Sequence, residues 1–100
     1  ANAPSKITMD MSKRIAALLE KFDIFVERVG VTADESVVLH LPGWCSDRGL
    51  PSEIEIYIDG LVATIPTVQN KYVDLTFDEL EDMFTHRDEN EEITNTQNQI

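Results

Sequence analysis

Residues 53–65 read EIEIYIDGLVATI. Polar and apolar side chains alternate from Glu53 to Ile58, which is the two-residue period of a strand with one buried face. The pair Asp59-Gly60 separates this run from a second apolar run and favours a type I′ turn, whose two central residues need positive φ. The segment therefore predicts a hairpin of two antiparallel strands, with the isoleucines of the first strand in the core.

Strands are also predicted on both sides of this hairpin. Residues 36–41 (SVVLHL) fit an inner strand, and residues 71–75 (KYVDL) can return beside the hairpin after Pro66 and a turn at Gln69-Asn70. Residues 42–52 hold two prolines and two glycines without periodicity, which predicts a long loop. The predicted sheet is a four-stranded, mainly antiparallel meander.

A helix is predicted on each side of the strands. Upstream, apolar residues recur at the three-and-four spacing of one helical face over residues 11–29, and Gly30 fits the left-handed residue that ends many helices. Downstream, Thr76 and Glu79 match a capping box, which predicts a short second helix. The fold class is α+β in the order α-β-β-β-β-α. The stripe of the long helix consists of Ile15, Leu18, Leu19, Phe22, Phe25, Val26 and Val29.

Composition suggests the domain boundaries. One hundred residues with 42% hydrophobic content fit one globular domain, which we place at residues 11–87. Residues 1–10 have little structural content and are expected to be disordered or left over from cloning. Residues 88–100 hold no aromatic residue and almost no apolar one, which predicts an acidic disordered tail.

The net charge of −11 is unevenly distributed along the chain. Residues 1–30 carry five basic and four acidic residues, a net of +1, whereas residues 31–100 carry three basic and fifteen acidic ones, a net of −12. Such a field repels nucleic acid and anionic lipid and speeds the encounter with basic proteins. Direct binding to DNA, RNA or a membrane is therefore not expected, and the expected partner is a basic protein surface.

An acidic row on the hairpin is the main candidate for binding that partner. Successive strand residues point to opposite sides, so Glu53, Glu55 and Tyr57 face away from the core. Residues two apart on a strand lie roughly 6.6–6.8 Å apart, a spacing of the same order as that of successive phosphates in a polynucleotide. Any acidic amphipathic strand has this spacing, so a merely solvated surface is the alternative. The predicted partner-binding residues are Glu53, Glu55, Tyr57, Asp59, Asp74, Asp78 and Asp82, with Trp44 of the loop as a further contact.

Motifs for other kinds of site are not found in the sequence. Two histidines and one cysteine lack the spacing of a metal site, and four scattered glycines do not form a phosphate-binding loop. Cys45 and His40 are five residues apart, but nothing around them matches a nucleophile with its base. We therefore expect no enzyme activity, no metal and no cofactor. The lone cysteine also favours a reducing compartment, which we take to be the cytoplasm.

Two functional hypotheses follow from these observations. The leading one is a small acidic non-enzymatic binding protein that engages a basic surface, in particular a nucleic-acid mimic that inhibits a DNA- or RNA-binding protein of the host. The alternative is a small acidic adaptor or secretion-type chaperone, which would hold an apolar client segment in an exposed groove. A homodimer through a sheet edge or the second helix is also open.

Overall fold

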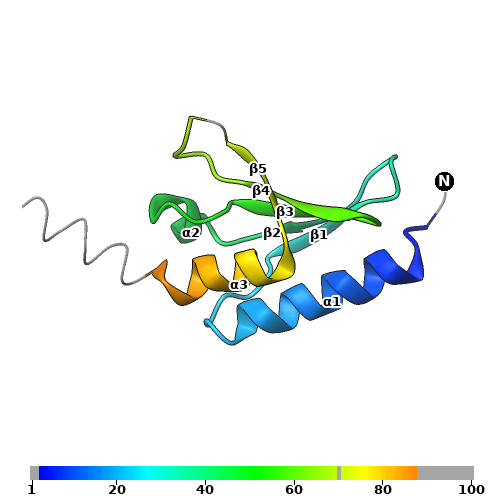
Figure 1. Cartoon of the computed structure of the whole chain (residues 1–100), viewed down its shortest axis with the longest axis horizontal. Helices are drawn as coiled ribbons and strands as arrows, with labels where there is room; N and C mark the ends of the chain where they lie inside the picture. Colours follow the sequence, from blue (N-terminus) through cyan, green and yellow to red (C-terminus); the bar gives the residue numbers. More distant parts are fainter. Residues whose placement is uncertain (1–2, 70, 88–100) are drawn as a thin grey trace, which may run out of the picture.

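Five antiparallel strands form one sheet, and the two longer helices lie on one of its faces (Figure 1). The computed structural model describes residues 3–69 and 71–87. Each strand pairs with the next in the chain, so the α+β class and the antiparallel sheet with a helix at each end are confirmed. The predicted number of four strands is wrong. The elements are α1 (Lys6–Glu20), β1 (Arg28–Val31), β2 (Val37–His40), α2 (Gly43–Asp47), β3 (Glu53–Tyr57), β4 (Gly60–Thr64), β5 (Tyr72–Leu75) and α3 (Phe77–Thr85).

The fifth strand comes from the C-terminal part of the predicted long helix. α1 ends at Glu20, and the chain reverses at Asp23, whose φ of 60° is left-handed. β1 then pairs with β2. The prediction of one helix over residues 11–29 is wrong because the helical spacing continues only by coincidence through Val26 and Val29, and β-branched valines are well suited to a strand.

α1 also begins earlier than predicted, at Lys6. The Ser5 hydroxyl caps the helix by accepting a hydrogen bond from the backbone N–H of Thr8 at 3.1 Å. Thr8 itself is buried against the core. Residues 6–10, which composition places outside the domain, therefore form the first turns of α1.

The β3–β4 hairpin turns one residue earlier than predicted. Tyr57 is paired with Gly60, so the central residues of the turn are Ile58 and Asp59. Neither has a positive φ, so the prediction of a type I′ turn at Asp59-Gly60 is wrong. Ile54 and Ile56 are buried as the alternation predicts, but Ile58 lies in the turn and is 63% exposed.

The segment 42–52, predicted as a long loop, contains the short helix α2. Cys45 and Leu50 from this segment are buried in the core. A helix of five residues has too few turns to show apolar periodicity, which is why the sequence does not predict it.

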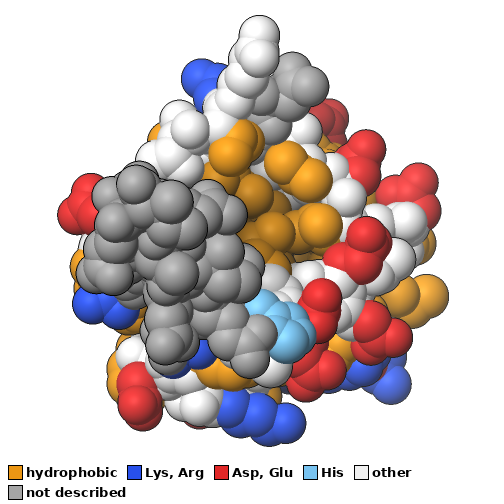
Figure 2. Space-filling view, turned by 60° about the vertical axis from the view of Figure 1, so that its left-hand side comes forward, with side chains coloured by type: hydrophobic (Ala, Val, Ile, Leu, Met, Phe, Trp, Pro, Cys, Tyr) orange, Lys and Arg blue, Asp and Glu red, His pale blue; other side chains and the backbone are white. Residues whose placement is uncertain are grey.

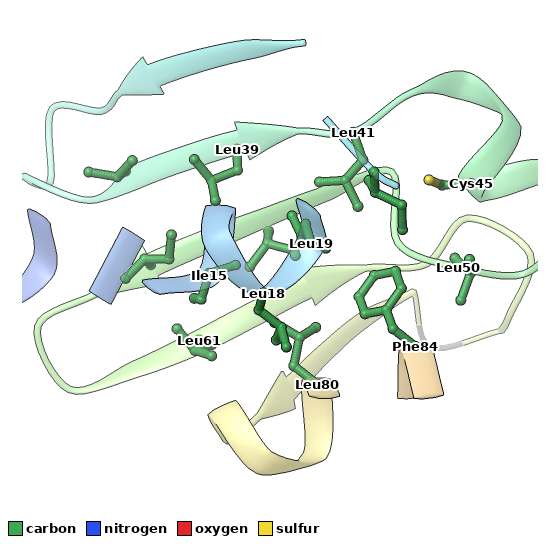
Figure 3. Packing of buried hydrophobic residues seen from close by; sticks show 14 residues of the cluster. Ile15, Leu18, Leu19, Leu39, Leu41, Cys45, Leu50, Leu61, Leu80 and Phe84 are labelled. Carbon is green, nitrogen blue, oxygen red and sulfur yellow. The ribbon is translucent and has the colours of Figure 1, made fainter. Parts of the chain in front are cut away.

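The core lies between the sheet and the two longer helices (Figure 3). Phe84 of α3 is fully buried and stacks on Phe22, with a distance of 6.0 Å between the ring centroids. This contact ties α3 to the segment that follows α1. The core side chains labelled in Figure 3 are Ile15, Leu18, Leu19, Leu39, Leu41, Cys45, Leu50, Leu61, Leu80 and Phe84.

α3 begins at the predicted capping box. The Thr76 hydroxyl accepts a hydrogen bond from the backbone N–H of Glu79 at 3.1 Å, and the Glu79 carboxylate accepts one from the N–H of Thr76 at 2.9 Å. These two bonds satisfy donors that the start of a helix leaves unpaired. The predicted acidic tail, residues 88–100, lies outside the described residues.

β1 forms one edge of the sheet and carries exposed apolar side chains. Val29 and Val31 are 61% and 57% exposed, since α1 packs mainly on β2 and β3. The outer N–H and C=O groups of an edge strand can pair with another strand. A homodimer through this edge stays a prediction.

Candidate partner-binding surface

The two longer helices cover one face of the sheet and leave the other face free of them (Figure 1). We call this second face the outer face. Strand pairing places the side chains of this outer face in two cross-strand rows. Glu53, Glu55 and Tyr57 lie on the outer face, as strand alternation predicts, and Asp74 of β5 joins them. The first row is Arg28, His40, Glu53, Thr64 and Tyr72, and the second is Gly30, Val38, Glu55, Val62 and Asp74.

Cations interrupt the acidic character of the outer face. His40, the neighbour of Glu53 across the strands, lies beside Arg28, with 3.3 Å between His40 Nε2 and Arg28 Nη2. Near the opposite edge, Lys71 Nζ lies 5.5 Å from the centre of the Tyr72 ring. A positive charge close to a carboxylate reduces the field that a distant cationic partner experiences. The outer face is therefore a mixed surface and not a continuous acidic row.

The Glu55 carboxylate is held by its neighbours in the fold. The buried Ser36 hydroxyl donates a hydrogen bond to Glu55 Oε2 at 2.6 Å. The Tyr57 side chain also hydrogen-bonds Glu55, and this bond, followed by burial, raises the pKa of the Tyr57 phenol. The Glu55 carboxylate is thus already engaged within the fold, and a partner would have to compete with these bonds to contact it.

The raised pKa of Tyr57 gives a titration that tests this arrangement. A pKa above its unfolded-state value stabilises the fold fully below about pH 10, and this contribution is lost as pH rises through the folded-state pKa. The chain has two tyrosines, so Tyr72→Phe leaves Tyr57 alone to report by its phenolate absorbance. Adding Glu55→Gln is expected to lower the pKa of Tyr57, because it removes the carboxylate that accepts the hydrogen bond of the neutral phenol and, with it, a nearby negative charge.

The matched control for this titration is Glu53→Gln in the same Tyr72→Phe background. Glu53 lies on the same strand and face as Glu55 and undergoes the same change of charge. Its replacement is expected to leave the Tyr57 titration where it was. An equal fall of the pKa in both variants would show that general charge, and not the hydrogen bond to Glu55, controls the phenol.

Five exposed carboxylates gather around the tip of the β3–β4 hairpin. Tyr57 and Asp59 line three adjoining hollows at this tip. One hollow, of about 360 Å³, is also lined by Asp74 and Glu79, and another, of about 130 Å³, by Asp34 and Glu35. Among the described residues, no Lys or Arg lines any of the three. We call Asp34, Glu35, Asp59, Asp74 and Glu79 the acidic tip.

Local structure holds Asp34, Glu35 and Glu79 of the acidic tip in place. In the β1–β2 turn, the Thr32 hydroxyl accepts a hydrogen bond from the backbone N–H of Asp34 at 3.2 Å, and Glu35 has a left-handed φ of 62°. The capping box fixes Glu79 directly after β5. Carboxylates fixed around hollows concentrate the negative potential there, which attracts cations.

The remaining predicted residues lie elsewhere. Asp78 and Asp82 are exposed on α3, in the helical layer, and Asp82 Oδ1 lies 3.1 Å from His86 Nε2. Trp44 on α2 is 38% exposed, with the Arg48 guanidinium 5.3 Å from its ring centre. Figure 2, in which the end of the molecule that carries α2 comes forward and the hairpin tip lies behind, shows Asp and Glu side chains to one side of a group of hydrophobic side chains. The predicted set is thus divided among the outer face, the hairpin tip, α3 and α2.

The two chemically reactive candidates of the sequence do not form a site in the structure. Cys45 lies fully buried in the core, and burial raises the pKa of its thiol, whereas His40 contacts Arg28 on the outer face. Within residues 3–69 and 71–87, no three His, Cys, Asp or Glu side chains are arranged to hold a metal ion. None of the helices in this part of the chain is both long and apolar enough to cross a membrane.

Comparison of the chain with protein-family models, with curated proteins and with solved structures finds no match. The acidic tip is a better candidate than the outer face for binding a cationic partner, because no Lys or Arg in the described part of the chain lines its hollows.

Three members of the acidic tip were missed by reasoning from the sequence: Asp34, Glu35 and Glu79. The first two belong to a turn that could not be recognised while β1 was taken as helix. The polar run between Val31 and Ser36 is the signal that could have revealed it, since such runs between two valine-rich segments mark hairpin turns. Glu79 was noticed only as a capping residue.

Proposed function

We propose that this protein is a non-enzymatic binding protein whose acidic tip engages a basic surface of another protein. The observation that supports this most is the grouping of five exposed carboxylates around adjoining hollows that no described Lys or Arg lines. Carboxylates held close together repel one another, and a cationic partner would relieve that repulsion. The overall charge of −11 would also speed the encounter.

We further propose that the partner is a nucleic-acid-binding protein, which this protein inhibits by occupying its phosphate-binding surface. Proteins that bind nucleic acid carry clusters of Lys and Arg that neutralise phosphates. The acidic tip offers the same kind of charge to such a cluster. The single, buried Cys45 is in keeping with a cytoplasmic location for this encounter.

The alternative, an adaptor or secretion-type chaperone, is supported by a different observation. The third hollow at the hairpin tip is mainly apolar and is bordered by exposed Ile7 and Ile58. An adaptor would use such a groove for an apolar client segment, and its binding would depend little on salt.

The test is capture of proteins from the native host lysate by three immobilised forms of the chain. The tip variant combines Asp34→Asn, Asp59→Asn and Asp74→Asn. The control variant combines Glu20→Gln, Asp23→Asn and Glu27→Gln, three exposed carboxylates at the end of α1 and in the segment that follows it, none of which lines the three hollows. Each variant changes the net charge from −11 to −8, because three carboxylates become amides.

A specific partner is expected to bind the wild type and the control alike and the tip variant roughly three- to 150-fold more weakly, because three exposed charge pairs at about 0.2–1 kcal/mol each are lost. Binding is expected to weaken at high salt and to be competed by DNA. An equal loss of binding in the tip variant and the control variant would show that only net charge matters and would contradict the proposal. Binding that DNA leaves unchanged would contradict the nucleic-acid-mimic part alone.

A further inference from the structure

An apolar groove opens beside the acidic tip. It has a volume of about 340 Å³ and lies between the first turns of α1, the β3–β4 turn and the start of α3. A volume near 300 Å³ is at the lower end of the range for ligand pockets, which suffices for one or two side chains of a peptide. We call it the tip groove, and its apolar lining consists of Ile7, Met11, Ile58, Leu61, Leu75 and Phe77.

Two large apolar residues of the tip groove are largely exposed to solvent. Ile7 and Ile58 are each 63% exposed. Ile58 occupies a central position of a two-residue turn, where Gly, Asn and Asp are the usual residues. A β-branched apolar side chain there contributes little to the core, and exposed apolar side chains that cluster at a groove mark contact with another molecule.

The charge around the tip groove indicates what kind of molecule that is. Asp59 lines the groove itself, and the other four carboxylates of the acidic tip line hollows that share Tyr57 and Asp59 with it. A cation also lies close to the groove, since the Arg14 guanidinium is 4.4 Å from the centre of the Phe77 ring. The net charge of the side chains around the tip groove is negative, so an occupant with positive charges beside its apolar part is favoured.

We propose that the tip groove binds an amphipathic cationic peptide segment of the partner protein. A hydrophobic side chain of the segment enters between Ile7 and Ile58, while its flanking Lys or Arg side chains contact the acidic tip. This inference rests on the proposed function and adds the chemistry of the segment that is recognised. It also explains why apolar and acidic groups occur at the same end of the molecule, since hydrophobic contacts supply affinity and charges supply orientation and rate.

The test measures binding of two synthetic peptides of equal charge to the full chain. In one peptide, leucines recur every three or four residues, so that they share one helical face, and lysines occupy positions between them. In the other peptide, every leucine is replaced by glutamine. The wild type is expected to bind the leucine peptide about tenfold more tightly, the value of one buried leucine side chain. The variant Ile7→Ser with Ile58→Ser is expected to bind both peptides equally, at the level of the glutamine peptide.

The control variant is Val29→Ser with Val31→Ser, which removes similarly exposed apolar side chains from β1. It is expected to keep the wild-type preference for leucine. Equal binding of both peptides to the wild type, or the same loss of preference in the control, would overturn the tip groove as the site while leaving the proposed function standing. Failure of both peptides to bind even at low salt would overturn both.

Discussion

Replacing Phe84 with alanine is expected to destabilise the protein by about 3–5 kcal/mol, the range for a fully buried phenylalanine. Phe84 is 0% exposed and stacks on Phe22, and with Leu80 it is one of the two fully buried side chains of α3. Its loss removes the stacking contact and leaves a cavity next to Phe22. Because the free energy of unfolding of small domains is about 5–15 kcal/mol, this one change would remove a large part of the stability. The measurement is urea unfolding followed by the fluorescence of Trp44.

The matched control is Thr85→Ala, which places alanine on an exposed position of the same helix. Its effect is expected to stay within about 0.5 kcal/mol. If Phe84→Ala unfolds at the same urea concentration as this control, α3 does not pack on the core as described.

Deleting residues 1–10 is expected to destabilise the protein by about 2–3 kcal/mol, although composition alone suggests that they are dispensable. The deletion removes the Ser5 cap, the first five residues of α1 and the buried Thr8. About 1 kcal/mol of the loss comes from the cap, and the rest comes from the removed helical residues together with the buried apolar part of Thr8. Thermal unfolding of the shortened chain measures the difference.

A deletion of residues 1–4 serves as the control for this experiment. It keeps Ser5 and all of α1 and is expected to unfold at the wild-type temperature. If both deletions leave the melting temperature unchanged, the first turns of α1 do not contribute to the core.

Patterns within a few residues of one another correctly predicted the features of the fold that depend on neighbouring residues. The alternation in residues 53–58 correctly placed Ile54 and Ile56 in the core, and the capping box correctly placed the start of α3. The hairpin turn was misplaced by one residue because Gly60 looked like a turn residue, whereas it pairs with Tyr57 in the sheet. Residue type alone does not distinguish these positions.

Tertiary interactions decided the parts that the sequence did not reveal. Val29 keeps the spacing of the α1 stripe, yet it lies in β1 because pairing with β2 outweighs a helical pattern that Asp23 interrupts. The same error hid Asp34 and Glu35 in the β1–β2 turn. Asp78 was grouped with the strand carboxylates, but the chain passes from the sheet to the helical layer at Thr76. Which acidic residues share a surface therefore depended on the layers and could not be read from spacing.

The uncovered edge of β1 has a consequence for how the protein behaves at high concentration. Eleven net negative charges per chain repel other copies at neutral pH, which opposes association through the apolar edge with Val29 and Val31. That protection disappears near the isoelectric point of about 4.3. Colloidal stability thus depends on the same acidity that we assign to recognition, and concentrated samples belong in buffers well above that pH.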